Sequence, residues 1–340
     1  MSVNLRAVTL ALAAFGLFAT HDVIVKLLGA DYSAFQIVFF SVLFSFPVAT
    51  VLLLRDETSG TLIPKHPWWV IARTLAAVIT GAAAFYAFSV LPLAQVYAIL
   101  FASPLLITIM SVPFLGEKVG LRRGLAVLAG LGGVLVVLNP GATELGLGHL
   151  AALTCALFGS FASIVVRKIG REERSIVLVL YPLVTNFVLM GALMPLVYRP
   201  MPVEHLGLSF AMAALAMVAM LCLIAAYKAG EAAIVAPMQY SQILWATAYG
   251  ALFFGELPRL NTAIGAAIII AAGVYIVLRE SRKPGSQAPV LRTRTRLDTG
   301  TVPRVSTLIR AGGAEPPNAP MPGAVGASPS RGMRGLPGRG

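Results

Sequence analysis

The strongest constraint on the fold of this chain is an internal repeat. Residues 87–117 and residues 226–256 align without a gap at an offset of 139 residues. The earlier copy reads AFSVLPLAQVYAILFASPLLITIMSVPFLGE, and the later copy reads AYKAGEAAIVAPMQYSQILWATAYGALFFGE. Both copies end in the same dipeptide, at Gly116–Glu117 and at Gly255–Glu256. Self-similarity at a fixed spacing marks a duplicated structural unit, so we expect two halves built from equivalent elements.

Both copies are apolar, and so is most of the chain. Hydrophobic residues make up 58% of the sequence and charged residues only 12%, whereas a soluble domain needs a more polar surface. Apolar runs of roughly 18–24 residues recur between residues 5 and 279, and a helix of that length crosses about 30 Å of hydrocarbon. The runs are too long for the strands of a membrane barrel. The sequence therefore predicts an all-α membrane protein.

Ten of these apolar runs are predicted to be transmembrane helices. Five lie in residues 5–139 and five in residues 148–279, so each half of the chain forms a five-helix repeat. The predicted helices are residues 5–28, 34–54, 70–91, 94–115, 122–139, 148–166, 175–197, 206–227, 232–254 and 262–279.

Lys and Arg are distributed unevenly between the two membrane sides that these helices define. If the N-terminus is cytoplasmic, the cytoplasmic segments before residue 279 hold 12 Lys and Arg residues. The external segments hold only Lys26, Arg199 and Arg259. Because positively charged loops stay on the cytoplasmic side, we expect a multi-pass protein of the cytoplasmic (inner) membrane with both termini in the cytoplasm.

The odd number of helices in each half sets the relation between the two copies. After five helices the chain re-enters the membrane from the opposite side, so Glu117 and Glu256 should lie at opposite surfaces. Such inverted repeats are related by a pseudo-two-fold axis in the membrane plane and are typical of secondary transporters. Because the two repeats share one sequence plan, the protein can adopt two related conformations, one inward-open and one outward-open. These two conformations are the physical basis of alternating access.

Residues 280–340 have a different composition from the rest of the chain. They hold 10 Lys and Arg residues against 3 Asp and Glu, and many Gly and Pro residues. We predict a disordered basic tail. The tail is either solvated without a partner or held near anionic membrane lipids on the cytoplasmic face. Because no aromatic residues alternate with the basic ones in a binding fold, no nucleic-acid partner is expected.

Two equivalent segments at mid-membrane carry the candidates for solute binding. Tyr97 and Phe101 lie one helical turn apart in residues 94–115, and residues 232–254 carry two amides and further aromatic rings. Such groups suit a pocket for a partly polar, planar organic solute. Helix–helix hydrogen bonding and ordinary packing are the alternative interpretation. The candidate substrate-binding residues are Gln239, Gln242, Tyr97, Tyr240, Trp245 and Phe101.

A proline falls in each of the same two segments. Pro104 and Pro237 are predicted to interrupt their helices and to free backbone carbonyls near the midplane, as in discontinuous transporter helices.

Charged residues inside the first predicted helix are candidates for coupling or gating. Asp22 and Lys26 are four residues apart, so they share a helix face and are expected to pair. The coupling interpretation is a carboxylate near the external surface that binds a proton or another cation, with His21 as a proton relay. The alternative is a purely structural pair with Lys26 extended toward the surface. His21 should point roughly 100° away from Asp22.

Small residues recur at four-residue spacing in two further helices. They are Ala126 with Gly130 and Ala129 with Gly133 in residues 122–139, and Ala263, Ala267 and Ala271 in the last predicted helix. Close helix contact follows, either within one chain or between the two chains of a homodimer.

The segment LPLAQVYAILFASPLLITIMSVPFLGEKVGLRRGLAVLAGLGGVLVVL, residues 91–138, resembles the core of an EamA domain of the drug/metabolite transporter superfamily. The helix ending in Phe-Leu-Gly-Glu, the basic turn and the Gly-rich helix after it carry the resemblance, and a weaker copy runs to about residue 279. The resemblance implies a ten-helix transporter of small organic solutes. In addition, residues 18–26 are similar to an Asp-x-x-x-Lys motif of S-adenosylmethionine-like and riboflavin-like uptake carriers.

Other functions have less support in the sequence. No Walker A loop is present, so the energy source would be a proton gradient, a sodium gradient or the solute gradient itself. A membrane-embedded transferase would need an acid/base or nucleophile group, and a channel would need a ring of charges or a carbonyl filter. A non-transporting receptor is a further alternative. Cys155 and Cys222 each lie in an apolar run, and we expect neither a metal nor a cofactor.

Overall fold

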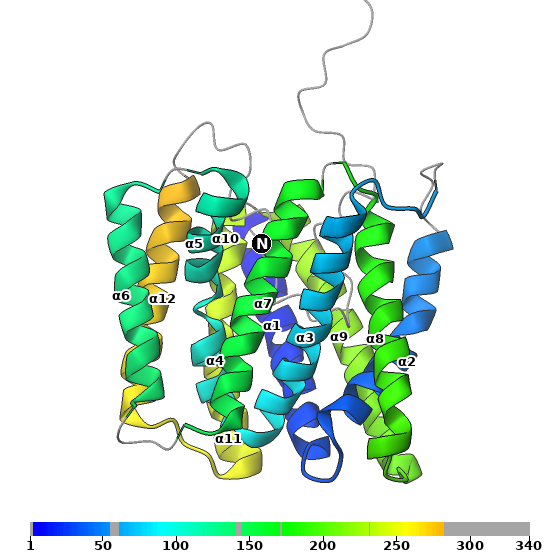
Figure 1. Cartoon of the computed structure of the whole chain (residues 1–340). Helices are drawn as coiled ribbons and strands as arrows, with labels where there is room; N and C mark the ends of the chain where they lie inside the picture. Colours follow the sequence, from blue (N-terminus) through cyan, green and yellow to red (C-terminus); the bar gives the residue numbers. More distant parts are fainter. Residues whose placement is uncertain are drawn as a thin grey trace, which may run out of the picture.

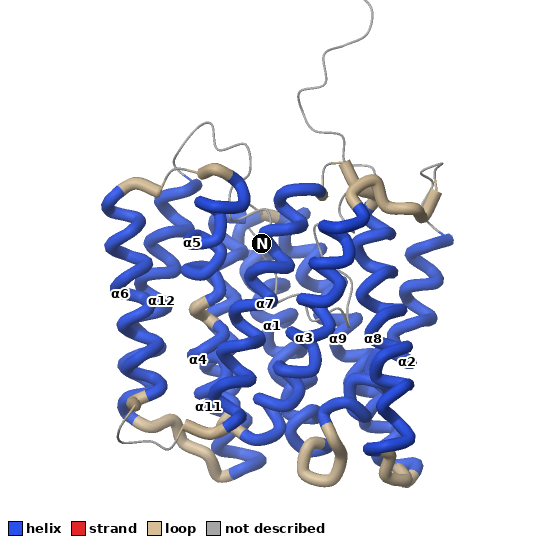
Figure 2. Tube along the Cα trace, viewed as in Figure 1, coloured by secondary structure: helices blue, strands red, loops and turns tan. Residues whose placement is uncertain are grey.

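The computed structural model describes residues 3–54, 61–117, 119–140, 145–170, 172–230 and 232–281. These residues form helices joined by short connections and contain no strand (Figure 2). The helices run side by side in one bundle (Figure 1). The predicted tail falls outside the described residues, apart from residues 280–281, which end the last helix.

Eight of the ten predicted helices are continuous, and their ends lie within three residues of the predicted ends. They are α1 (Val3–Leu28), α2 (Ala34–Leu54), α3 (Pro67–Val90), α6 (Leu121–Leu138), α7 (Leu147–Ile169), α8 (Ser175–Val197), α9 (Val203–Ala229) and α12 (Leu260–Ser281).

The other two predicted helices are broken. The first consists of α4 (Leu93–Leu100) and α5 (Ser103–Leu115). The second consists of α10 (Ala232–Val235), the 3-10 turn η1 (Ala236–Ser241) and α11 (Gln242–Phe254). Pro104 lies in the first turn of α5 and Pro237 in the first turn of η1, where a residue without an amide hydrogen leaves no hydrogen bond unmade. The predicted interruptions are confirmed.

Seven helical segments of the described residues are long and apolar enough to cross a membrane, and they include the pair α4–α5 taken together. Two shorter apolar helical stretches, Ala34–Pro47 and Leu260–Ile276, accompany them. Length and composition therefore agree with a multi-pass membrane protein.

The most extensive helix contacts all join the first half of the chain to the second. They are α1 with α9, α3 with α7, α6 with α12, and α2 with α8. Under the repeat offset, α1 corresponds to α7 and α3 corresponds to α9, so the α1–α9 contact is equivalent to the α3–α7 contact. The α6–α12 contact and the α2–α8 contact each join two helices that correspond to one another. The first helices of the two halves, α1 and α7, run in opposite directions (Figure 1). The core is thus built across the two halves rather than within each.

A glycine in the left-handed region ends the fourth helical segment of each half. Gly116 follows α5 with φ of 69°, and Gly255 follows α11 with φ of 65°. The next amide then folds back in the same way in both copies: Glu117 N–H donates to the Ser111 carbonyl at 3.3 Å, and Glu256 N–H donates to the Gly250 carbonyl at 2.9 Å. Because glycine has no Cβ, it adopts this conformation without strain and places a glutamate directly after each helix.

The small residues of α6 form a contact inside the chain. A Cβ on Gly133 would lie 2.9 Å from the Gly265 carbonyl oxygen of α12, and a Cβ on Gly130 would lie 2.4 Å from Leu105. On the last helix the predicted face does not pack within the chain, which leaves the homodimer alternative as a prediction. Gly265 and Ala272 pack against α6, whereas the predicted residues of that helix are exposed: Ala263, Ala267 and Ala271. Hydrophobic spacing alone does not identify which small face packs, because both faces of an apolar helix are equally apolar.

Candidate functional site

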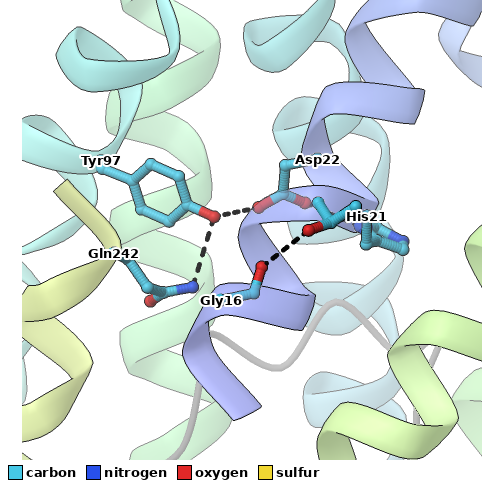
Figure 3. A network of polar contacts seen from close by, with 6 residues as sticks. Gly16, His21, Asp22, Tyr97 and Gln242 are labelled. Carbon is cyan, nitrogen blue, oxygen red and sulfur yellow. Dashed lines mark hydrogen bonds and ion pairs between the residues drawn. The ribbon is translucent and has the colours of Figure 1, made fainter. Parts of the chain in front are cut away.

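Asp22 lies at the centre of a buried polar network (Figure 3). Asp22 is only 1% exposed, and it lies among apolar helices. One carboxylate oxygen is 2.7 Å from His21 Nδ1, and the other accepts a hydrogen bond from the Tyr97 hydroxyl. The Gln242 side-chain amide donates to the same hydroxyl at 3.3 Å. Helix α11 of the second half is therefore joined, through the Tyr97 hydroxyl, to the carboxylate at which α1 and α4 of the first half meet.

His21 corrects the expectation that it points away from Asp22. The backbone directions of adjacent helical residues do diverge, but rotation about the side-chain bonds brings the imidazole back to the carboxylate. The ring also meets Phe85 of α3 edge-on, with 6.0 Å between ring centroids, and only 2% of the residue is exposed. His21 thus belongs to the network, and the prediction of diverging side chains was wrong.

Lys26 corrects the predicted pairing with Asp22. Its ammonium nitrogen lies 2.7 Å from Glu256 Oε1, donates to the Leu91 carbonyl at 2.6 Å, and lies 5.2 Å from the centre of the Phe254 ring. Leu91 follows the end of α3 and Glu256 lies just after α11, so Lys26 binds at the ends of neighbouring helices rather than on its own helix. Asp22 is engaged by His21 and Tyr97 instead.

A row of buried aromatic rings extends from the network across the bundle. Ring centroids are 5.3 Å apart for Phe88 and Tyr97, 6.1 Å for Tyr97 and Phe101, and 5.0 Å for Phe101 and Tyr240. The row links α3, α4 and η1. Tyr240 packs closely against α12, where a Cβ on Gly273 would lie 2.0 Å from the tyrosine hydroxyl oxygen. Three of the predicted binding residues thus lie in one contiguous row.

The remaining two predicted binding residues lie apart from this network. Gln239 is half-buried on η1, outside the hydrogen bonds around Asp22. Trp245 lies against Gly16 of α1, where an added Cβ would be 3.2 Å from the indole ring, and the residue is 37% exposed. The ring centroids of Trp245 and Tyr249 are 6.0 Å apart. The Tyr249 hydroxyl accepts a hydrogen bond from the Thr20 hydroxyl at 3.1 Å.

Sequence reasoning missed several side chains of this region. Phe85 and Phe88 pack against the network from α3, and Thr20 and Tyr249 form a second polar link between α1 and α11. From the sequence, Glu256 was noted only as the last residue of the repeat and not as a partner of Lys26. The signal that could have identified it is that the same position of the other copy is also a glutamate, Glu117.

At the other end of the bundle Glu117 has an equivalent partner. Its carboxylate lies 2.5 Å from the Arg167 guanidinium, near the end of α7. The adjacent Lys168 donates to the Phe114 carbonyl at 3.1 Å and lies 4.4 Å from the centre of the Trp69 ring. The two glutamates of the repeat thus each bind a cation from the opposite half.

The network combines groups that can hold a polar organic molecule. A buried carboxylate binds a proton or another cation, the amide and phenol offer hydrogen bonds, and the rings offer stacking surfaces. In the residues that the structure describes, no three His, Cys, Asp or Glu side chains are grouped as metal ligands would be.

Several known transporters are similar to this chain. A riboflavin transporter of Rhizobium johnstonii is 29% identical over 249 residues, which cover 72% of this chain and 81% of that protein. An S-adenosylmethionine uptake transporter of Rickettsia bellii is 26% identical over 264 residues, covering 78% and 90%. The pseudopaline exporter CntI of Pseudomonas aeruginosa is 24% identical over 276 residues, covering 79% and 95%.

Structure and family comparisons agree with these likenesses. A solved crystal structure covers 82% of this chain and 99% of its own at a TM-score of 0.50 and 19% identity, which supports the fold alone. The profile of the EamA-like transporter family matches residues 5–139 and again residues 146–279. Because these two matches span well over half of the sequence, the chain belongs to the EamA-like transporter family.

Proposed function

We propose that this metabolite transporter works by alternating access, with the Asp22 network as the central solute site. The observation that carries the proposal is the hydrogen-bonded link from Asp22 through Tyr97 to Gln242, which joins the two halves of the chain at one buried carboxylate. A site shared by two halves changes its exposure when one half moves against the other. The buried polar groups of the network then have a use beyond packing.

The proposal includes a topology of ten membrane spans in two inverted repeats, residues 5–139 and residues 148–279. The opposite directions of α1 and α7 support it (Figure 1). The helix contacts support it as well, because the α1–α9 contact and the α3–α7 contact are equivalent under the repeat. The excess of Lys and Arg on one set of connections supports a cytoplasmic position for both termini and a location in the inner membrane.

The proposed solute is a planar heterocyclic compound that is neutral or carries positive charge. The aromatic row of Phe88, Tyr97, Phe101 and Tyr240 suits stacking on a flat ring, and Gln242 suits hydrogen bonding to heteroatoms in that ring. Asp22 suits a positive group on the solute or a coupled proton, with His21 as its relay. Relatives named for riboflavin and S-adenosylmethionine support this class.

Binding to the purified protein tests the proposal. Riboflavin and S-adenosylmethionine would be titrated in detergent while thermal unfolding is followed. A solute present at about 100 times its dissociation constant adds about 2.7 kcal/mol to the free energy of unfolding. Because Gln242→Ala removes a hydrogen-bond donor from the network, we expect it to reduce this gain.

Gln239→Ala is the matched comparison, since it removes the same amide three residues away and outside the network. Its effect on the ligand-induced gain is expected to be smaller than that of Gln242→Ala. If Gln239→Ala abolishes binding while Gln242→Ala leaves it intact, the solute site lies elsewhere on η1 and the proposal fails.

A further inference from the structure

Two ion pairs join the halves of the chain at opposite ends of the bundle. Lys26 pairs with Glu256 at 2.7 Å where α1 and α11 end, and Arg167 pairs with Glu117 at 2.5 Å where α7 and α5 end. In Figure 1 helix α11 ends at the bottom of the view and helix α5 ends at the top. The Asp22 network lies on the inner side of the Lys26–Glu256 pair, because Asp22 precedes Lys26 by one helical turn on α1.

The two ion pairs occupy corresponding places in the two halves of the chain, with glutamates that the repeat aligns and cations from the same helical turn. Glu117 and Glu256 occupy the same position of the two copies, 139 residues apart. Lys26 and Arg167 each lie in the last turn of the first helix of their half. Each pair therefore links the first helix of one half to the fourth helical segment of the other half. An ordinary surface ion pair has no reason to recur in this way.

Helix α3 is contacted at both of its ends, by Lys26 itself and by the residue next to Arg167. At one end Lys26 donates to the Leu91 carbonyl, which follows the last residue of α3. At the other end Lys168, next to Arg167, lies over the ring of Trp69 in the first turn of α3. Within the ion pairs themselves the cationic side chains are largely shielded from solvent, at 9% exposed for Lys26 and 2% exposed for Arg167, whereas Lys168 is exposed.

We propose that these pairs are two corresponding latches that close opposite ends of the transport path. The external latch is Lys26–Glu256 and the cytoplasmic latch is Arg167–Glu117. Opening one latch exposes the central site to one side while the other latch keeps it closed to the opposite side. This inference rests on the proposed alternating access. Because a partly buried charge left without its partner is unfavourable, separation of a latch requires hydration of both charges by water entering the opened end.

Side-specific thiol labelling tests the latches without any solute. The reporter is Ser241→Cys, directly before Gln242, where the serine hydroxyl oxygen is buried. The background is the full chain with Cys155 and Cys222 replaced by Ala. A membrane-impermeant maleimide is applied to right-side-out and to inside-out membrane vesicles. The two latch variants, Glu256→Gln and Glu117→Gln, are matched because the repeat makes their positions equivalent.

We expect Glu256→Gln to accelerate labelling about tenfold from the external side and Glu117→Gln to accelerate it about tenfold from the cytoplasmic side. Exchanging the charges with Lys26→Glu and Glu256→Lys together should restore slow labelling. Unchanged rates, acceleration by both variants from the same side, or equal acceleration from both sides would each overturn the proposal.

Solute flux measured on the same variants separates this proposal from the proposed function. Side-specific labelling in a protein that neither binds nor moves the tested solutes would support the latches and remove the solute assignment. Normal flux in Glu256→Gln and Glu117→Gln with unchanged labelling would keep the transport function and overturn the latches.

Discussion

At the scale of single residues, Asp22 depends most on its neighbours. A carboxylate buried among apolar helices is unfavourable unless donors or a proton compensate it. Tyr97 donates from another helix, and His21 supplies an ionisable ring at 2.7 Å. Within the network, only Gln242, which donates to the Tyr97 hydroxyl, comes from the other half of the chain. Under the proposed alternating access, loss of this one contact is how movement of one half against the other would change the surroundings of Asp22.

Asp22→Asn tests whether this carboxylate carries the coupling proton. The amide has the same shape but does not titrate, so we expect transport to lose its dependence on pH if Asp22 carries the coupling proton. Initial rates of solute flux into vesicles at a series of pH values measure this. Asp31→Asn is the control, because Asp31 lies exposed in the turn after α1. An Asp22→Asn protein with the pH profile of the unmodified protein would contradict proton coupling at this residue.

At the scale of helices, α6 and α12 form a contact in which glycines let the two backbones meet with no side chain between them. The contact is reciprocal: a Cβ on Gly265 would lie 2.6 Å from the Gly133 carbonyl oxygen, just as a Cβ on Gly133 would lie 2.9 Å from the Gly265 carbonyl oxygen. Backbone cannot move aside as a flexible side chain can, so even one methyl group separates the helices. Without a hydrophobic force between helices in lipid, such close packing supplies much of their attraction.

Gly133→Ala should therefore destabilise the protein by about 1–3 kcal/mol through overpacking. Gly132→Ala is the matched control in the same helix, because a Cβ there meets nothing within 4 Å. It should leave stability unchanged or raise it slightly, since Ala favours helix over Gly. Thermal unfolding in detergent compares the two, and equal melting temperatures for both variants would be inconsistent with close α6–α12 packing.

At the scale of the whole molecule, the sidedness of the chain is open to a direct test. Val203 is 80% exposed at the start of α9, and Ile63 is 75% exposed in the connection before α3. With Cys155 and Cys222 removed, we expect Val203→Cys to react with an impermeant maleimide in intact cells. Ile63→Cys should react only in inside-out vesicles, because the proposed topology places the basic connections in the cytoplasm. The reverse pattern would place the N-terminus outside and exchange the assigned sides of the two latches.

The helices and the repeat were determined by the sequence itself, because both depend on local properties. Hydrophobic length sets where a helix can cross lipid, and Pro104 and Pro237 interrupt helices through their own missing amide hydrogens. The resemblance to the EamA domain was equally local, since it rested on contiguous motifs, and the family match confirms it. Asp22, Tyr97 and Gln242 stood out for a related reason: polar groups are conspicuous in apolar segments.

Only the tertiary structure decided which of these polar groups meet. Spacing on one helix favoured Asp22 with Lys26, but Lys26 binds Glu256, which is 230 residues away in the sequence. Likewise Gln242 joins the network and Gln239 does not, although both are amides on the same segment. Side-chain reach and the packing of helices from opposite halves determine such contacts. These distances depend on how the whole bundle closes, and no local pattern of residues encodes them.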